Sequence, residues 1–173
     1  MASESTKAHR DNAEEMPPVV VAVLTISDTR TPETDTGGKL IREGLEKSGC
    51  VVAHVEIMKD EPEQIRARLL ELCASNKFGA IITTGGTGIS PRDGTFEAVS
   101  GILEKELPGF GELFRMLSWH EVGAAAMLSR ATAGLRGRTL IFSMPGSTNA
   151  VGVAMDKLII PELQHMIWEM SRK

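Results

Sequence analysis

The segment over residues 81–95 holds the residue types most suited to chemistry. A β-branched apolar run ends in three glycines within four residues, and a polar loop with one Arg and one Asp follows before the helix expected at Thr95. Glycines let the backbone turn sharply and let a ligand approach the main chain. Exposed N–H groups in such a turn, next to a helix N-terminus, bind phosphate or another anion.

The aspartate of this loop, Asp93, does not suit a pure anion cradle because its charge repels phosphate. A divalent cation between Asp93 and a phosphate would resolve that conflict. The loop has no P-loop lysine and no GxGxxG spacing, which disfavours a nicotinamide-dependent oxidoreductase. The simpler alternative is a glycine-rich turn without chemistry, but three glycines with Ser90, Arg92 and Asp93 exceed what a turn needs.

Further candidate residues follow other expected strands. Asp60 comes after an alternating strand, and its simplest role is a solvated N-cap of the next helix. Asp28 lies in the first loop, where it serves equally well as a turn residue. The turn over residues 145–149 is a second candidate anion site, although one of its hydroxyls could instead cap a helix. Arg130 is expected at the solvated surface.

The elements that must position these loops alternate between strands and helices. The first strand is almost continuously apolar, as in a strand covered on both faces, whereas the second alternates and indicates a half-exposed strand near a sheet edge. We expect strands over residues 19–26, 51–58, 80–84 and 139–144, and helices over residues 36–47, 61–74, 96–105, 110–120 and from residue 151 onward, where Pro161 breaks or restarts the helix.

This alternation predicts an α/β fold, a doubly wound three-layer sandwich with a mainly parallel sheet. Ligands in such folds bind beyond the carboxyl ends of the strands, where the strand order reverses. If the second strand is an edge, the first and third strands are neighbours. The loops that contain Ser27 and Gly85 then share one crevice.

Composition bounds the function. The 173 residues suit a single domain, expected over residues 17–173 after a disordered polar tail over residues 1–16. A net charge of −4 gives no reason to expect nucleic acid or an anionic membrane as a partner. Cys50 and Cys73 match no zinc spacing, so reduced thiols are expected. No segment resembles a membrane span or a signal peptide, which predicts a cytoplasmic protein.

Taken in order, the motifs form a specific set over residues 19–168. They are Thr25-Ile26-Ser27-Asp28, Asp35-Thr36-Gly37-Gly38, Asp60-Glu61, Thr83-Thr84-Gly85-Gly86-Thr87-Gly88 with Arg92-Asp93, Leu128-Ser129-Arg130 with Ala133-Gly134, and Met144-Pro145-Gly146-Ser147. This set resembles the molybdopterin adenylyltransferase family of molybdenum cofactor biosynthesis, the MoaB/MogA-like proteins. The sequence Pro-Gly-Ser-Thr-Asn-Ala in the last loop resembles the MoaB branch more than the MogA branch.

The resemblance implies a molybdopterin-binding-like domain that uses Mg²⁺ and ATP to adenylylate molybdopterin and releases pyrophosphate. It implies that Asp60 and Asp93 are the catalytic and metal-binding carboxylates. The residues that it implies for substrate and nucleotide binding are Ser27, Asp28, Gly85, Gly86, Thr87, Gly88, Arg92, Ser129, Pro145, Gly146 and Ser147. A homotrimer or homohexamer is expected, with the downstream metal-insertion protein as a further partner.

Two other functions remain open from the residues. One is a non-catalytic protein of the same fold that binds a pterin or a nucleotide without turnover. The other is a scaffold subunit with a vestigial pocket. An enzyme releases pyrophosphate, a binding protein only binds the ligand, and a scaffold does neither.

Overall fold

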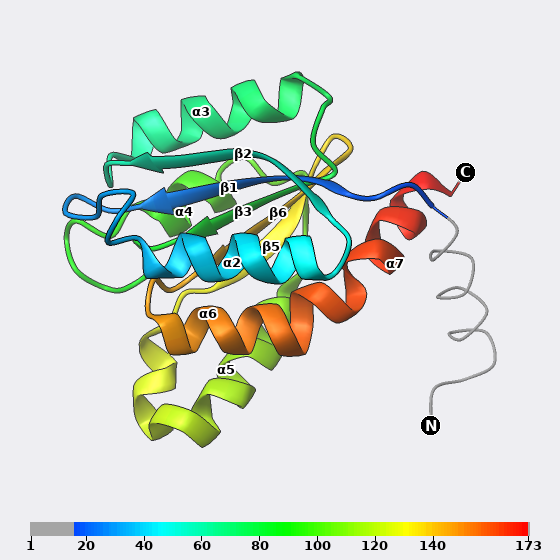
Figure 1. The fold of residues 1–173 in the computed structure, drawn as a ribbon. Helices are drawn as coiled ribbons and strands as arrows, with labels where there is room; N and C mark the ends of the chain where they lie inside the picture. The colour runs from blue at the N-terminus through cyan, green and yellow to red at the C-terminus, as the bar shows by residue number, and fades with distance from the viewer. Residues whose placement is uncertain (1–15, 173) are drawn as a thin grey trace.

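The computed structural model describes residues 16–172, which build one six-stranded sheet with helices on both faces (Figure 1). The sheet order is β2-β1-β3-β6-β5-β4. The strands are β1 (Val20–Ile26), β2 (Val51–Met58), β3 (Ala80–Thr84), β4 (Lys105–Glu106), β5 (Thr132–Arg136) and β6 (Thr139–Met144). The first four strands in this order are parallel, which confirms the predicted α/β fold. The tail predicted over residues 1–16 lies almost wholly outside the described residues.

The strand β1 lies at the centre of the parallel part and is covered on both faces. Val21 and Val23 pack into the core on one side of the sheet, and Ala22 and Leu24 pack into the core on the other. Its neighbours are β2 and β3, as predicted, with β2 at the edge. The strand order therefore reverses between β1 and β3, and their carboxyl ends are the expected position of a ligand site.

The helices divide into two layers. One layer contains α2 (Thr36–Lys47), α5 (Pro108–Val122), α6 (Thr148–Ala154) and α7 (Ile160–Ser171), and its core includes Phe114 and Phe142. The other layer contains α3 (Pro62–Ala74) and α4 (Thr95–Ser100), which pack Ile65, Leu69 and Val99 against the sheet. No helix among residues 16–172 is long and apolar enough to cross a membrane.

The predicted helix over residues 96–105 is wrong beyond Ser100. Gly101 closes α4, and the chain then turns to pair with β5, since Glu104 donates its N–H to the carbonyl of Leu135. The pairing makes β4 the second edge of the sheet. The sequence did not predict β5, because Ala133 and Gly134 lack the branched side chains that mark strands.

Two prolines stand at helix starts, where the absence of an N–H is tolerated. Helix α5 begins at Pro108, two residues before the predicted start. Pro161 is the second residue of α7, but the helical path runs on from α6 without a break, so Pro161 neither ends nor restarts the helix as predicted. A π-helical turn, η2 (Met155–Ile159), joins α6 to α7 without a loop. Residues between α5 and β5 form a 3₁₀ helix, η1 (Gly123–Leu128).

The edge strand β2 is half-exposed as predicted, but its apolar side chains are the more exposed ones. Val51 is 48% exposed and Val55 is 46% exposed. His54 and Glu56 point to the covered side, where Glu56 pairs with Arg68 of α3 at 2.8 Å. The polar residues of this strand thus bind α3, and the apolar ones remain at the surface beside α2.

Candidate functional site

Three loops that follow parallel strands meet at one end of the sheet: residues 27–35 after β1, 85–94 after β3 and 145–147 after β6. Gly85 has a φ of +102° and donates its N–H to the carbonyl of Met144 at 3.0 Å. A Cβ on Gly85 would collide with the carbonyl oxygen of Ile26, and a Cβ on Gly146 would lie 3.4 Å from Gly85 Cα. The loop after β3 therefore packs against the end of β1 and against the loop after β6, and the crevice expected between the Ser27 and Gly85 loops stays a prediction.

Asp60 is a buried link between loops, with only 8% of its surface exposed. Its Oδ1 accepts a hydrogen bond from the N–H of Gly94 at 3.2 Å, and its own N–H donates to Asp28 Oδ1 at 3.3 Å. Glu61 holds the N-cap position of α3, and no side chain caps that helix. The expected role of Asp60 as a solvated N-cap is therefore wrong, because its carboxylate binds the backbone before α4 instead.

Gly86 completes a small cradle beside Asp60. It has a φ of +64°, and a Cβ there would collide with Asp60 Oδ2 and with Thr95 Oγ1. The Thr95 hydroxyl is fully buried and has no hydrogen-bond partner among the described residues. A carboxylate oxygen and an unpartnered hydroxyl therefore flank the glycine turn.

This cradle fits a Mg²⁺ ion that arrives with a nucleotide. Mg²⁺ binds through one or two carboxylates together with substrate phosphates, and it seldom occupies an all-protein cage. Residues 16–172 contain no group of three or more His, Cys, Asp or Glu side chains placed to hold a metal. An ion at this position would draw on Asp60 and Asp93 as carboxylate ligands, while the Gly85 N–H is already donated to Met144.

Arg92 connects the loops that follow β1, β2 and β3. Its guanidinium pairs with Asp28 at 2.9 Å and with Glu61 at 3.0 Å. The hydrogen bond from Arg92 is the main cause that lowers the pKa of Asp28 below its usual value. Because both carboxylates already neutralise Arg92, it fixes the loops and is a poor anchor for a phosphate in this conformation.

Asp93 turns its carboxylate into its own loop. Asp93 Oδ2 accepts a hydrogen bond from the N–H of Ser90 at 2.8 Å, and the Asp93 N–H donates to the Ser90 carbonyl at 2.9 Å. A Cβ on Gly88 would lie 2.8 Å from the same carboxylate oxygen. The loop is thus pre-formed around Asp93, and a bound cation would compete with the Ser90 N–H for this carboxylate.

Arg130 holds both ends of the segment over residues 87–93. Its backbone N–H donates to the Thr87 carbonyl at 3.2 Å, and its Nη2 donates to the Asp93 carbonyl at 2.9 Å. The guanidinium also lies 5.1 Å from the ring centre of Phe96 and pairs with Glu97. The expectation of a solvated surface arginine is wrong. Sequence gave no signal, because the side-chain partners lie 33 and 37 positions away.

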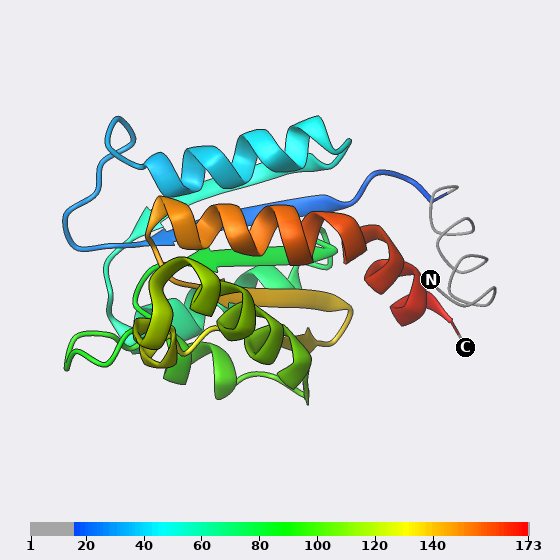
Figure 2. The ribbon, with the colours of Figure 1, turned by 90° about the horizontal axis from the view of Figure 1, so that it is seen from below.

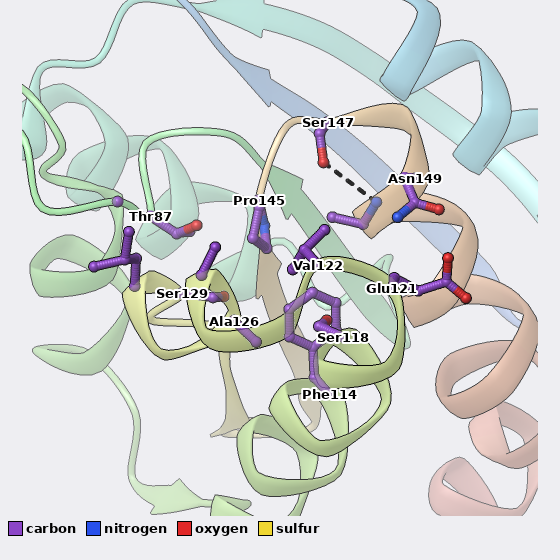
Figure 3. Close-up of a pocket in the computed structure, with 14 residues that line it drawn as sticks. Thr87, Phe114, Ser118, Glu121, Val122, Ala126, Ser129, Pro145, Ser147 and Asn149 are labelled. Atoms are coloured by element: carbon purple, nitrogen blue, oxygen red, sulfur yellow. Dashed lines mark hydrogen bonds between the residues drawn. The ribbon is translucent and has the colours of Figure 1, made fainter.

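A cavity of about 250 Å³ opens between the loops after β3 and β6, the end of α5 and η1 (Figure 3). Most residues that line it are apolar or carry a hydroxyl, and Glu121 is the one charged residue among the described residues that line it. The lining includes Thr87, Gly88, Phe114, Ser118, Val122, Ala126, Ser129, Pro145, Ser147 and Asn149. Such walls suit a planar polar ring, with apolar contacts on its faces and hydrogen bonds at its edges.

The structure divides the predicted binding residues between the cavity and the carboxylate cluster. Thr87, Gly88, Ser129, Pro145 and Ser147 line the cavity. The cluster contains Asp28, Asp60, Gly86, Arg92 and, through its loop, Asp93. Sequence did not identify the α5 and η1 residues of the cavity wall, because their helical spacing is the same as that of core residues.

The remaining predicted residues shape the loops. Ser27 Oγ accepts hydrogen bonds from the N–H groups of Thr29 and Arg30, at 3.2 and 3.1 Å. Ser147 is the N-cap of α6, where its Oγ accepts from the Ala150 N–H at 3.3 Å. Ser147 therefore confirms the predicted N-cap and also lines the cavity, and the anion site at this turn stays a prediction.

The known proteins to which this chain is similar are molybdopterin-binding and molybdenum cofactor biosynthesis proteins. Residues 22–165 match the family described as the probable molybdopterin binding domain. The molybdenum cofactor biosynthesis protein B of Bacillus subtilis (strain 168) is 48% identical over 165 residues, which cover 94% of this chain and 97% of that protein.

Solved structures of molybdenum and tungsten cofactor biosynthesis proteins have a similar fold. A crystal structure of molybdenum cofactor biosynthesis protein B is 50% identical, with a TM-score of 0.88 over 92% of this chain and all of that chain. The tungsten cofactor synthesizing protein MoaB from Pyrococcus furiosus is 36% identical, with a TM-score of 0.80 over 90% of this chain and 98% of that one.

The buried carboxylate of Asp60 leads to a prediction of how the stability of the fold depends on pH. Burial is the main cause that raises its pKa above 3.8, repulsion by Asp93 and Asp28 adds to this, and the hydrogen bond from Gly94 opposes it. Since the folded-state pKa is the higher one, this group favours folding most below pH 3.8, and that contribution is lost as the pH rises through the folded-state pKa. Asp60→Asn keeps an acceptor for Gly94 and should raise the melting temperature at pH 7.5.

The gain from Asp60→Asn should shrink as the pH falls towards 4, which thermal melts over this range would measure. Asp28→Asn is the opposite-sign comparison, because the pKa of Asp28 is lowered. It should slightly lower the melting temperature at neutral pH. An unchanged or lower melting temperature for Asp60→Asn at pH 7.5 would contradict the inference that the buried Asp60 carboxylate destabilises the fold at that pH.

Arg130 makes a prediction about the loop. Arg130→Gln removes the guanidinium that binds the Asp93 carbonyl, so amide exchange over residues 88–94 should speed up about tenfold, the effect of one charge-assisted hydrogen bond. Arg136→Gln is a matched control, because Arg136 likewise donates to a carbonyl, that of Ile102, and pairs with Glu104. Equal protection of the loop in both variants, measured by hydrogen exchange, would refute the role of Arg130 in holding this loop.

Proposed function

The chain belongs to the molybdopterin-binding domain family that contains MoaB and MogA, and we propose that it adenylylates molybdopterin with Mg-ATP. Its relatives are proteins of molybdenum cofactor biosynthesis, and we assign the chain to that pathway and to the cytoplasm. The single observation that carries the proposal is the adjacency of a ring-sized cavity, lined mainly by apolar groups and hydroxyls, and a carboxylate-flanked glycine turn, both built on residues 85–94.

The reaction joins two phosphates. The terminal phosphate oxygen of molybdopterin attacks the α-phosphorus of ATP, the bond from that phosphorus to the bridging oxygen breaks, and pyrophosphate leaves. Positioning and charge neutralisation supply catalysis of this kind, and no protein nucleophile is required. Mg²⁺, when bound, neutralises phosphate charge. The chain's own part is to hold both substrates in line.

The cavity supplies the ring site. Its walls hold one carboxylate, Glu121, and no cation, so a phosphate would find no counter-charge among the lining side chains. A pterin presents several donors and acceptors on its edges, which suit Ser118, Ser129 and Ser147. We therefore assign the pterin ring to the cavity and its phosphate to the end lined by Thr87 and Gly88.

The glycine turn supplies the phosphate site. Asp60 and Thr95 fill the space that a Cβ on Gly86 would need, so only glycine lets the turn pack against them. We assign the phosphate to the backbone N–H groups of this turn other than that of Gly85, which Met144 accepts. Asp60 is held by Gly94, and Asp93 is held by Ser90 and, through its carbonyl, by Arg130. These contacts position two carboxylates before a ligand arrives, which lowers the reorganisation that binding requires.

The test is pyrophosphate release from Mg-ATP with and without molybdopterin. Wild-type protein should release pyrophosphate only with the pterin present, and Asp93→Asn should reduce turnover about a hundredfold or more while the protein remains folded. Asparagine keeps the acceptor for the Ser90 N–H, so the loop should persist. The matched control is Asp156→Asn, which neutralises an exposed carboxylate in η2.

Two outcomes would refute the proposed enzymatic activity. Pterin binding without pyrophosphate release would make the chain a binding protein, and neither binding nor release would make it a scaffold. Undiminished turnover in Asp93→Asn would refute the metal role of that carboxylate.

The exposed apolar side chains of α5 and η1 support an assembly of several copies, expected as a homotrimer or homohexamer. This region forms the lowest part of the molecule in Figure 1 and faces the viewer in Figure 2. Six large apolar residues of this region are 46% to 76% exposed: Leu113, Met116, Trp119, Val122, Met127 and Leu128. Apolar groups gathered in this way mark association surfaces.

The assembly is tested by placing charge on this surface. The double variant Met116→Glu/Trp119→Glu should sediment as monomers, because burying two carboxylates against apolar groups costs several kcal/mol. Leu40→Glu is the control, as Leu40 is a 39% exposed apolar residue of α2. A double variant that sediments like wild-type protein would exclude this surface as the contact.

A further inference from the structure

A second concave surface lies away from the candidate site, between α2, the loop after β1 and the edge strand β2. It encloses about 570 Å³, within the range of small-molecule sites. We call it the α2 groove. It shares no lining residue with the cavity described above, and it is lined by Arg30, Thr31, Pro32, Asp35, Gly38, Lys39, Arg42, Val55, Glu56 and Ile57.

The carboxylates in the α2 groove are already satisfied from within the fold. Asp35 Oδ1 accepts from the Gly38 N–H at 2.9 Å, and Asp35 Oδ2 accepts from Thr25 Oγ1 at 2.7 Å. Glu56 Oε2 pairs with Arg68 at 2.8 Å and lies 2.7 Å from His54. Asp35 keeps its charge, but among residues 16–172 neither carboxylate forms an ion pair with a cation of the groove.

The three cations of the groove are held more weakly than these carboxylates within residues 16–172. Lys39 lies 3.9 Å from Glu43 in an exposed pair that is worth little. Arg30 donates Nη1 to the Thr34 carbonyl, an uncharged acceptor. For Arg42, residues 16–172 offer no carboxylate at ion-pair distance in the structure. The groove consequently carries an excess of positive charge on a protein whose net charge is −4.

Apolar side chains form the other wall. Pro32 and Val55 are exposed, and Ile57 is half-buried beside them. Val55 belongs to the strand face that the fold leaves uncovered. Three cations facing an apolar wall match a ligand with an anionic group at one end and an apolar or aromatic body at the other.

We propose that the α2 groove binds a phosphorylated small organic molecule, with its phosphate on Arg30, Lys39 and Arg42 and its body on Pro32, Val55 and Ile57. The helix N-terminus does not supply this site, since Asp35 already caps the Gly38 N–H. The site is independent of the proposed adenylyl transfer, because none of its residues belongs to the carboxylate cluster or to the cavity.

The test uses adenosine monophosphate as the probe on the full chain, in chelator-treated buffer without Mg²⁺ or pterin. In an NMR titration, the amide signals over residues 38–42 and 55–57 should shift together and yield one dissociation constant. Adenosine should not bind, because it lacks the phosphate, and inorganic phosphate should bind more weakly, because it lacks the body.

Matched variants separate a site from a general attraction to basic residues. Lys39→Gln/Arg42→Gln should raise the dissociation constant tenfold or more. Lys77→Gln/Arg138→Gln removes the same charge from exposed residues that precede β3 and β6, and should change it less than twofold. Asp93→Asn should leave it unchanged, so failure here remains distinct from failure of the proposed enzyme.

Several results would overturn the proposal. One is amide shifts confined to residues 85–94 and 145–149, which would place the nucleotide in the candidate site alone. Others are equal weakening by the two double variants, equal affinity for adenosine and its monophosphate, or equal affinity for the monophosphate and inorganic phosphate.

Discussion

The close approach of backbone at Gly85 and Gly86 is the constraint on which the site depends. At Gly85 the chain turns with positive φ against the carbonyl of Ile26, and its N–H is taken by Met144. At Gly86 it passes between Asp60 and Thr95 with no room for a Cβ. These two contacts join the ends of β1, β3 and β6 to the loop after β2. Any side chain at either position would separate elements that the candidate chemistry needs together.

This constraint separates charge from apolar surface. The cluster on one part of the β3 loop holds Asp28, Asp60, Glu61, Arg92 and Asp93, whereas the cavity on the next part is lined by hydroxyls and apolar groups. The segment over residues 87–93 belongs to both, and Arg130 fixes its two ends. A shift of that segment would therefore move a cavity wall and the Asp93 carboxylate together, which would couple the two proposed substrate positions through one loop.

The sequence predicted the parallel core of the fold because its signals there are local. The apolar run of β1, the helical stripe of α2 and the glycines after β3 each act within a few residues. The wrong predictions concern residues whose role depends on a partner far away in the sequence. Asp60 was predicted to be an N-cap, but its carboxylate accepts a hydrogen bond from Gly94, 34 positions later in the chain. Arg130 was predicted to be solvated, because its partners Asp93 and Glu97 are remote in the chain. The strand β5 was missed because Gly134 serves close packing against Lys105, which strand propensity does not register.

The burial of Asp60 bears on whether the site is active. An ionised carboxylate that is 8% exposed, beside two further aspartates and with a raised pKa, costs stability at neutral pH. The unpartnered Thr95 hydroxyl adds a second cost at the same point. A scaffold gains nothing from the charge or from the hydroxyl, since Asp60→Asn would keep the acceptor for the Gly94 N–H and Thr95→Val would fill the same space without these penalties. A cation held between Asp60 and a phosphate would remove the electrostatic cost, and this favours a site that functions over a vestigial one.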